Sequence, residues 1–150
     1  MERNEKAKQC TTCGFVYYFN PSSAVACFIR NSKGELLLVR RAKEPAKGTL
    51  DLPGGFVDMY ESAEDAAHRE VKEETGLDVT NITYFGNQAW PYPSGLMVGF
   101  IADYAGGEIK LQEEELSSGD FYTRDNLPEL PRKLSLARKM IDWWLECSHK

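Results

Sequence analysis

The stretch of sequence that decides the fold, residues 55–77, reads GFVDMYESAEDAAHREVKEETGL. Three of its carboxylates, Glu70, Glu73 and Glu74, fall within five residues, and Glu61 precedes them in the same stretch. Like charges this close repel one another, so a chain keeps them where a cation or a substrate compensates their charge. The pattern favours a site that carries chemistry, and a solvated acidic helix end is the alternative.

The same stretch predicts a loop followed by a helix. Ser62 and Asp65 form a capping box, so the helix begins near Ala63 and Glu61 stays in the loop. Gly76 suits the left-handed residue that follows the end of a helix. The carboxylates are therefore divided between a loop and a helix.

Within this helix, small side chains and two carboxylates share one stripe at three- and four-residue spacing: Ala63, Ala66, Ala67, Glu70 and Glu74. We expect the alanines to pack against a sheet and the carboxylates to emerge at its edge. Magnesium prefers oxygen ligands, so Glu70 and Glu74, one turn apart, can hold such an ion together. Glu73 can hold a second ion or accept a proton from the attacking water.

Arginine and glycine residues complete the expected site. Arg69 can form a bidentate pair with Glu61, which would hold the loop against the helix. Gly54 and Gly55 let the backbone come close to the metal, and the Gly54 carbonyl could itself be a ligand. The joint offsets of glycine, arginine and glutamate favour catalysis over a solvated surface, and we assign Glu73, Arg69 and Glu61 to the catalytic machinery.

The whole chain has the length and composition of one ordinary globular domain, with 150 residues, 42% hydrophobic and 27% charged. Its net charge of −5 lacks the basic excess that sequence-independent nucleic-acid binding needs. No apolar run approaches transmembrane length and the first residues have no signal-peptide core, so we expect a cytoplasmic protein without membrane contact. The four cysteines are then thiols or metal ligands.

The rest of the chain predicts strands joined by turns. Strands are expected at residues 24–30, 35–41, 49–52, 79–84, 96–104, 108–111 and 121–122. Lys33 and Gly34 supply the turn chemistry of a β-hairpin between the first two. Cys27 alternates within the first strand, which predicts a buried apolar side chain.

A last helix is expected at residues 133–147. It carries two apolar stripes, one of Leu134, Ala137, Ile141 and Leu145, the other of Leu136, Met140, Trp143 and Cys147. A helix that is apolar on two sides predicts contact beyond its own core, so we expect a homodimer.

The pattern in residues 55–77 resembles the Nudix box, and the chain from about residue 23 to the end is similar to the Nudix hydrolases. The resemblance implies an α/β fold, an α/β/α sandwich around a mixed β-sheet. It implies a domain at 23–150 preceded by a tail at 1–22. It also implies hydrolysis of the pyrophosphate linkage in a nucleoside diphosphate derivative, with Mg²⁺ or Mn²⁺ held by Glu70 and Glu74 and with Glu73 assisting.

A second motif, residues 87–97 reading NQAWPYPSGLM, resembles the SQPWPFPxSLM array of NADH pyrophosphatases. The resemblance implies cleavage of NADH to two mononucleotides, with Gln88 and Trp90 among the substrate-binding residues. Gly95 departs from the array because it lacks the serine hydroxyl that can contact the substrate. A loop that serves only packing is the alternative.

Three further positions match residues that act in these pyrophosphatases. Glu115 matches one more metal-binding glutamate, and a solvated charge is its alternative. Phe56 matches an aromatic that stacks on the nicotinamide, and Tyr18 matches a residue contributed by the partner subunit. Both aromatics could instead belong to the core.

Cys10 and Cys13, followed by two tyrosines, match the second of two cysteine pairs that form a zinc ribbon in these enzymes. Structural zinc needs four ligands, and Cys147 and His149 are the other candidates in this chain. Because nothing in the sequence places them nearby, we expect a remnant knuckle rather than bound zinc.

The leading functional prediction is a metal-dependent hydrolase of NADH or a related dinucleotide. Gly95 and the absent first cysteine pair favour an ADP-ribose, nucleotide-sugar or FAD pyrophosphatase as the alternative. A non-catalytic nucleotide-binding module is disfavoured because all the box carboxylates are present. The same chemistry could remove an RNA cap, which the acidic balance does not favour.

Overall fold

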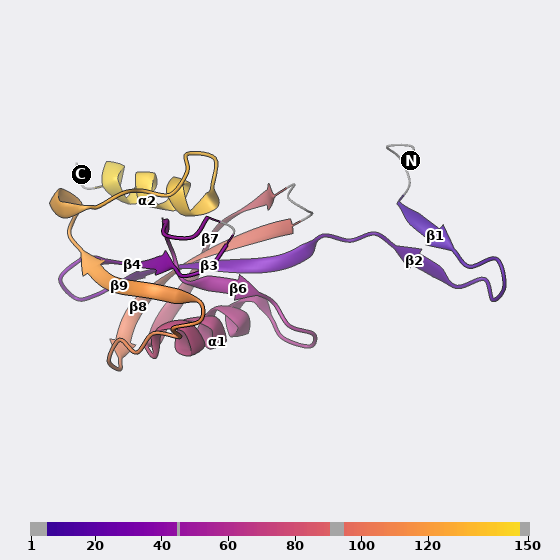
Figure 1. The fold of residues 1–150 in the computed structure, drawn as a ribbon, viewed down its shortest axis with the longest axis horizontal. Helices are drawn as coiled ribbons and strands as arrows, with labels where there is room; N and C mark the ends of the chain where they lie inside the picture. Colours follow the sequence, from indigo (N-terminus) through magenta and orange to yellow (C-terminus); the bar gives the residue numbers. More distant parts are fainter. Residues whose placement is uncertain (1–5, 45, 91–94, 148–150) are drawn as a thin grey trace.

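The computed structural model describes residues 6–44, 46–90 and 95–147, so predictions for residues 91–94 and for His149 lie outside it (Figure 1). Its elements in chain order are β1 (Ala7–Gln9), β2 (Val16–Tyr18), β3 (Ser22–Arg30), β4 (Leu36–Arg41), β5 (Leu50–Asp51), β6 (Gly54–Phe56), α1 (Ala63–Thr75), β7 (Asp78–Trp90), β8 (Gly95–Gly106), β9 (Leu116–Tyr122), the 3-10 helix η1 (Arg124–Asn126) and α2 (Leu136–Cys147). No helix in these ranges is long and apolar enough to cross a membrane.

A mixed sheet forms the centre of the molecule, with the strand order β5-β4-β3-β8-β7. The pairing of β3 with β8 is parallel, and the other pairings are antiparallel, including β6 on β3 and β9 on β4. The predicted hairpin of residues 24–30 and 35–41 is confirmed as β3 and β4, with the turn closed by a hydrogen bond from Gly34 N to Asn31 O.

The two helices cover opposite faces of this sheet (Figure 1). Val25, Cys27 and Ile29 of β3 point to the face covered by α1, whereas Phe28 points to the face covered by α2. Strands buried on both faces read as continuous apolar runs, which is why β3 and β4 lack a polar side. The predicted α/β/α sandwich is confirmed, and Cys27 is buried as expected.

Helix α1 has the predicted boundaries. The Ser62 side chain accepts a hydrogen bond from Asp65 N at 3.1 Å, and Gly76 adopts the left-handed conformation with φ of 77°. Ala66 and Ala67 are fully buried against the sheet, as predicted from their small size. The carboxylates one turn further along are thereby brought to the sheet's edge.

The prediction of a strand at residues 108–111 is wrong. Lys110 N donates to Thr75 O at 2.8 Å and Gln112 N donates to Glu74 O at 2.9 Å, so this segment satisfies the last carbonyls of α1 instead of joining the sheet. The short strand predicted at residues 121–122 is β9, which pairs with β4 and is five residues longer than expected. Strand β7 also runs beyond the predicted 84, to Trp90.

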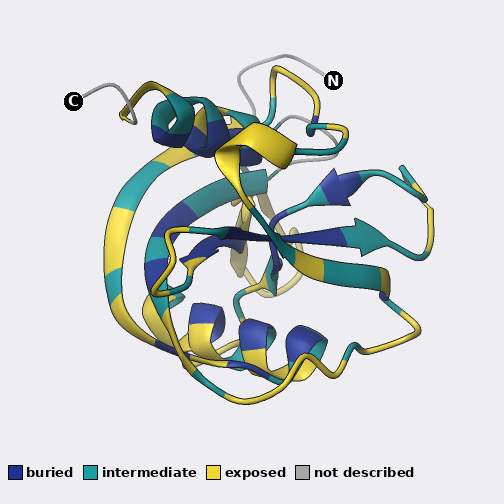
Figure 2. Ribbon diagram, turned by 90° about the vertical axis from the view of Figure 1, so that its left-hand side faces the viewer, coloured by how far each residue is buried: buried dark blue, intermediate teal, exposed yellow. Residues whose placement is uncertain are grey.

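The two-stripe argument for an interface on the last helix is also wrong. Residues from both expected stripes, Leu136, Ala137, Met140 and Ile141, are buried in one core cluster with Trp144. The inner side of α2 is the buried one (Figure 2). This helix therefore packs on its own sheet.

The amino-terminal residues form a small hairpin of β1 and β2 that stands apart from the sheet (Figure 1). Residues 7–9 are thus a strand rather than the loose tail that their polarity predicted. Cys10 and Cys13 lie at the turn, where Gly14 N donates to Cys10 O at 3.0 Å.

Candidate functional site

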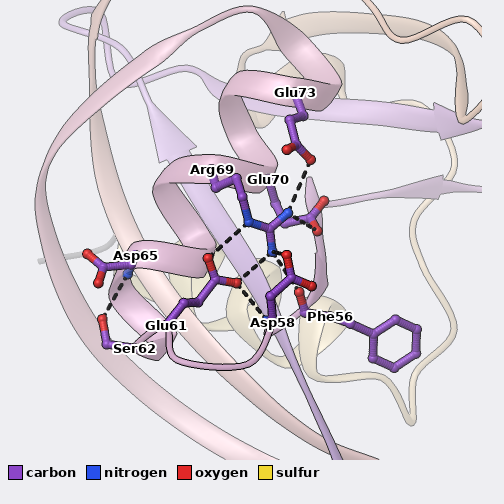
Figure 3. A network of polar contacts seen from close by, with 8 residues as sticks. All are labelled: Phe56, Asp58, Glu61, Ser62, Asp65, Arg69, Glu70 and Glu73. Carbon is purple, nitrogen blue, oxygen red and sulfur yellow. Dashed lines mark hydrogen bonds and ion pairs between the residues drawn. The ribbon is translucent and has the colours of Figure 1, made fainter.

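Arg69 is the centre of a polar network on helix α1 (Figure 3). Its guanidinium donates to both carboxylate oxygens of Glu61, from Nε at 3.0 Å and from Nη2 at 2.6 Å. Nη2 also donates to Phe56 O at 2.9 Å, and Nη1 donates to Glu70 Oε1 at 2.9 Å and to Glu73 Oε2 at 3.1 Å. The predicted bidentate brace between loop and helix is present.

The charges of this network do not balance. One guanidinium forms ion pairs with four carboxylates, because Asp58 also lies within 3.4 Å of Arg69 Nη2. The Arg69 hydrogen bonds lower the pKa of Glu61 to about 2, with a contribution from Asp58 N. Burial raises the pKa of Glu70 despite the neighbouring Arg69. The network therefore has more negative than positive charge.

Glu74 lies beyond the reach of this guanidinium. Its Oε2 accepts a hydrogen bond from Gly54 N at 3.1 Å, and it has no ion-pair partner within the described residues. Burial raises its pKa to about 8, and the negative charges of Glu70, Glu115 and Asp51 add to this effect. A carboxyl in these surroundings favours either a proton or a cation from outside.

Gly54 and Gly55 allow the close approach that the sequence predicted. A Cβ atom on Gly54 would lie 1.9 Å from the backbone oxygen of Val25. A Cβ atom on Gly55 would lie 2.4 Å from the carboxyl carbon of Glu70. The glycine pair therefore seats β6 against β3 on one side and against the helix carboxylates on the other.

Glu115 comes near this group because the segment after Gly107 follows the end of α1. Its carboxylate pairs with Lys43 at 2.5 Å, and its charge contributes to the raised pKa of Glu74. Glu115 is therefore ion-paired in this arrangement, and its assignment as a metal ligand stays a prediction.

The donor set fits a hard divalent cation. Glu70, Glu73, Glu74 and Glu115 offer only carboxylate oxygens, which suit Mg²⁺ and Mn²⁺. Within the described parts of the chain, no group of three or more Asp, Glu, His or Cys side chains lies close enough together to hold a metal ion in this arrangement. Arg69 forms ion pairs with Glu70 and Glu73, and Lys43 forms one with Glu115, so a metal would compete with them for three of these four carboxylates.

A cavity of about 570 Å³ adjoins Glu74 and the glycine pair. Its size is typical of a small-molecule site. Trp90 lines it, as expected for a substrate-binding residue, together with Met97 of β8. Gln88 is not among its lining residues; its Nε2 donates to Leu134 O at 2.6 Å and ties β7 to the segment before α2.

Neither of the two remaining aromatics belongs to the core. The ring of Phe56 is 66% exposed and points away from the Arg69 network (Figure 3). Tyr18 is 63% exposed on the separate β1–β2 hairpin, and the structure does not bring it to the site within this chain.

Sequence reasoning missed the polar residues of the cavity. Asp51, Arg41 and Arg132 line it, and the pKa of Asp51 is raised by burial. The signal for Asp51 was an acidic residue within an otherwise apolar short strand next to the glycine pair. Arg132 follows a proline in a loop and gave no comparable signal.

Comparison with known proteins identifies the family. The family model described as NUDIX domain matches residues 20–144. The chain is 42% identical over 147 residues to the NAD-capped RNA hydrolase NudC of Haemophilus influenzae, and 38% identical over 142 residues to that of Pseudomonas aeruginosa. These matches cover 96% and 95% of this chain but 55% and 50% of the relatives. The chain thus spans about half the length of the curated relatives it matches.

Solved structures share the fold. A NUDIX hydrolase from Nitrosomonas europaea matches with a TM-score of 0.76 and 23% identity, over 94% of this chain and 79% of the other. A MutT protein from Methanosarcina mazei matches with a TM-score of 0.67 and 28% identity, over 86% and 96%. Together with the family model over most of the chain, these likenesses confirm the resemblance seen in residues 55–77. The chain belongs to the NUDIX domain family.

Proposed function

We propose that this chain is a metal-dependent pyrophosphohydrolase that cleaves a dinucleotide such as NADH to two mononucleotides. The observation that carries the proposal is Glu74, a carboxyl without a cation partner in the described residues, placed between the glycine pair and a cavity of nucleotide size. The NudC relatives, whose name refers to an NAD cap, support a dinucleotide substrate.

The proposed roles follow from the surroundings of each residue. Glu70 and Glu74 would hold Mg²⁺ or Mn²⁺, with Glu115 and the Gly54 carbonyl as further ligands. The bound ion would offset the charge of the phosphates and lower the pKa of a coordinated water. Glu73 is about half exposed, so an oxygen not held by Arg69 can accept the proton of that water.

Arg69 and Glu61 would act by positioning. Their bidentate pair holds the loop between β6 and α1, and Arg69 also contacts the Phe56 carbonyl and orients Glu70 and Glu73. A rigid guanidinium fork suits this task because it holds several carboxylates in fixed directions.

The substrate assignment depends on the aromatic residues near the cavity. Trp90 lines the cavity, and Phe56, which follows the lining residue Gly55, exposes its ring, so both suit stacking on a base. Gln88 would need to leave the Leu134 carbonyl to reach a substrate. With Gly95 in place of a serine, ADP-ribose, nucleotide sugars and FAD are the alternative substrates.

An NAD-capped RNA end is a second candidate substrate. The name of the NudC relatives favours it, and the diphosphate to be cut is the same as in free NAD. The net charge of −5 favours the free dinucleotide, because it offers no general attraction to an RNA chain.

A homodimer is part of the proposal. The β1–β2 hairpin exposes Phe15, Tyr17, Tyr18 and Phe19, and such a group of apolar rings suits contact with a second subunit. Tyr18 would then reach the partner's site. A cytoplasmic location also belongs to the proposal, as does a metal-free knuckle at Cys10 and Cys13.

The test is a hydrolysis panel of NADH, NAD, ADP-ribose, FAD, dinucleoside polyphosphates and NAD-capped RNA, with Mg²⁺ or Mn²⁺ and product separation by chromatography. We expect NADH to give two mononucleotides at the highest kcat/KM. Cleavage of none of these compounds would contradict the enzyme assignment. Preference for ADP-ribose or FAD would contradict the NADH assignment alone.

A further inference from the structure

The cavity beside Glu74 has polar lining residues to which the proposed function assigns no role. Asp51, at the end of β5, is one of them, and Arg41 and Arg132 are others. Asp51 pairs with Val39 of β4 in the sheet register, so its position is fixed by backbone pairing.

Asp51 has spare capacity to accept a hydrogen bond. Its Oδ1 accepts from Leu52 N at 2.8 Å, the only hydrogen bond to its side chain within the described residues. An ionised carboxylate has about four acceptor sites and no donor. A half-buried carboxylate beside a cavity therefore favours a ligand that supplies O–H or N–H groups.

The place of Asp51 restricts which part of a nucleotide it can meet. Gly54 follows Asp51 by three positions, so their Cα atoms lie at most about 10 Å apart. The phosphates must lie at the Gly54 and Glu74 end, and their oxygens only accept hydrogen bonds. The group attached directly to the phosphates is the ribose, whose two hydroxyls donate.

Other residues that line the cavity suit the base attached to this ribose. Trp90 and Met97 offer apolar surface that suits the base, whereas Arg41 interacts electrostatically with Asp51 and partly balances its charge.

We propose that Asp51 is a specificity residue that accepts hydrogen bonds from the ribose diol of the nucleotide bound in this cavity. The inference rests on the proposed function, because it assumes a nucleotide whose phosphates lie at Glu74. It goes beyond that function by making the chain selective for ribonucleotides over nucleotides without the diol.

The experiment measures the binding of AMP and of 2′,3′-dideoxy-AMP by calorimetry in the presence of Mg²⁺. In the parent protein AMP should bind about 10- to 100-fold more tightly, the range expected for hydrogen bonds to a charged acceptor. In Asp51→Ala the ratio should fall to near one. Asp51→Asn should give an intermediate ratio, because its amide oxygen still accepts.

Asp120→Asn is the matched control, since Asp120 is exposed on β9 and away from the cavity lining. It should keep the parent ratio. Equal binding of the two nucleotides to the parent, binding of neither, or an unchanged ratio in Asp51→Ala would overturn the inference. If Asp51→Ala does not fold, Asp51→Asn decides, and a ratio equal to that of the parent would overturn the inference.

Mn²⁺ binding distinguishes this role from metal ligation. Asp51→Asn should bind Mn²⁺ as the parent does, and a loss as large as that of Glu74→Gln would make Asp51 a ligand and overturn the inference. The nucleotide ratio is measured without turnover. Absence of hydrolysis would therefore contradict the proposed function and leave the test of Asp51 valid.

Discussion

Glu61 and Glu74 belong to one motif, yet the fold places them in opposite electrostatic surroundings. Glu61 receives both arms of the Arg69 guanidinium, and its pKa falls to about 2. Glu74 receives one backbone N–H, from Gly54, and its pKa rises to about 8. This difference supports the roles proposed above, in which Glu61 positions the loop and Glu74 is a metal ligand.

The largest effect should come from Glu74→Gln. The amide keeps the size of the side chain but removes the charge that holds the metal, so kcat should fall at least about 100-fold, equivalent to ~3 kcal/mol of lost charge stabilisation. Thermal stability of the metal-free protein should stay equal or rise, because a half-buried charge is removed. Steady-state kinetics with NADH and a melting curve check the two parts. A variant as active as the parent would remove Glu74 from the site.

Gly54 and Gly55 are neighbours on β6, but substituting them should affect different properties, stability at Gly54 and activity at Gly55. Gly54→Ala meets the Val25 backbone and should cost about 3 kcal/mol of unfolding free energy. Gly55→Ala meets the movable Glu70 carboxylate, so it should lower activity with little loss of stability. Denaturant unfolding and kinetics on both variants measure the contrast. Equal stability losses in the two variants would contradict it.

Arg69→Lys tests the paired side of the comparison. Lysine keeps the charge but cannot form the fork, so the unfolding free energy should fall by about 2 kcal/mol. The activity loss should be smaller than for Glu74→Gln, because Glu74 does not contact Arg69 in this structure. Urea unfolding gives the first quantity. A variant with parental stability would show that the brace contributes nothing to folding.

Much of this arrangement could be predicted from local sequence signals. Ser62, Asp65 and Gly76 mark the helix ends because capping depends on residues a few positions apart, and the Arg69–Glu61 pair follows from that register. The course of residues 108–112 could not be predicted. Their alternating pattern suits a strand, but the unsatisfied carbonyls of Glu74 and Thr75 capture their N–H groups.

The lining of the cavity was also hard to predict from the sequence, because it depends on tertiary contacts. Asp51, Arg41 and Arg132 come from three segments that only the sheet and the approach to α2 bring together. For Gln88 the motif predicted a substrate-binding role. In the structure its amide donates to the Leu134 carbonyl, a tertiary contact that no local pattern predicts.

The smallest expected effect is a dependence of metal stabilisation on pH. The pKa of Glu74 is raised from 4.5 to about 8, so the metal-free folded state binds a proton that the unfolded state releases between these values. Metal-free stability should therefore fall as pH rises through this window, whereas the metal should stabilise more at pH 8.5 than at pH 6. Melting temperatures with and without Mg²⁺ at both pH values measure this. Glu74→Gln should abolish the difference, and an equal Mg²⁺ shift in the parent at both pH values would contradict it.

The most direct test of the role proposed for Glu74 is Mn²⁺ binding followed by electron paramagnetic resonance at pH 8. Glu74→Gln is compared with the parent and with Glu64→Gln, a matched control on the exposed side of the same helix. The account predicts at least about tenfold weaker Mn²⁺ binding for Glu74→Gln and parental binding for Glu64→Gln. Parental binding by Glu74→Gln would contradict the claim that this carboxylate holds the metal.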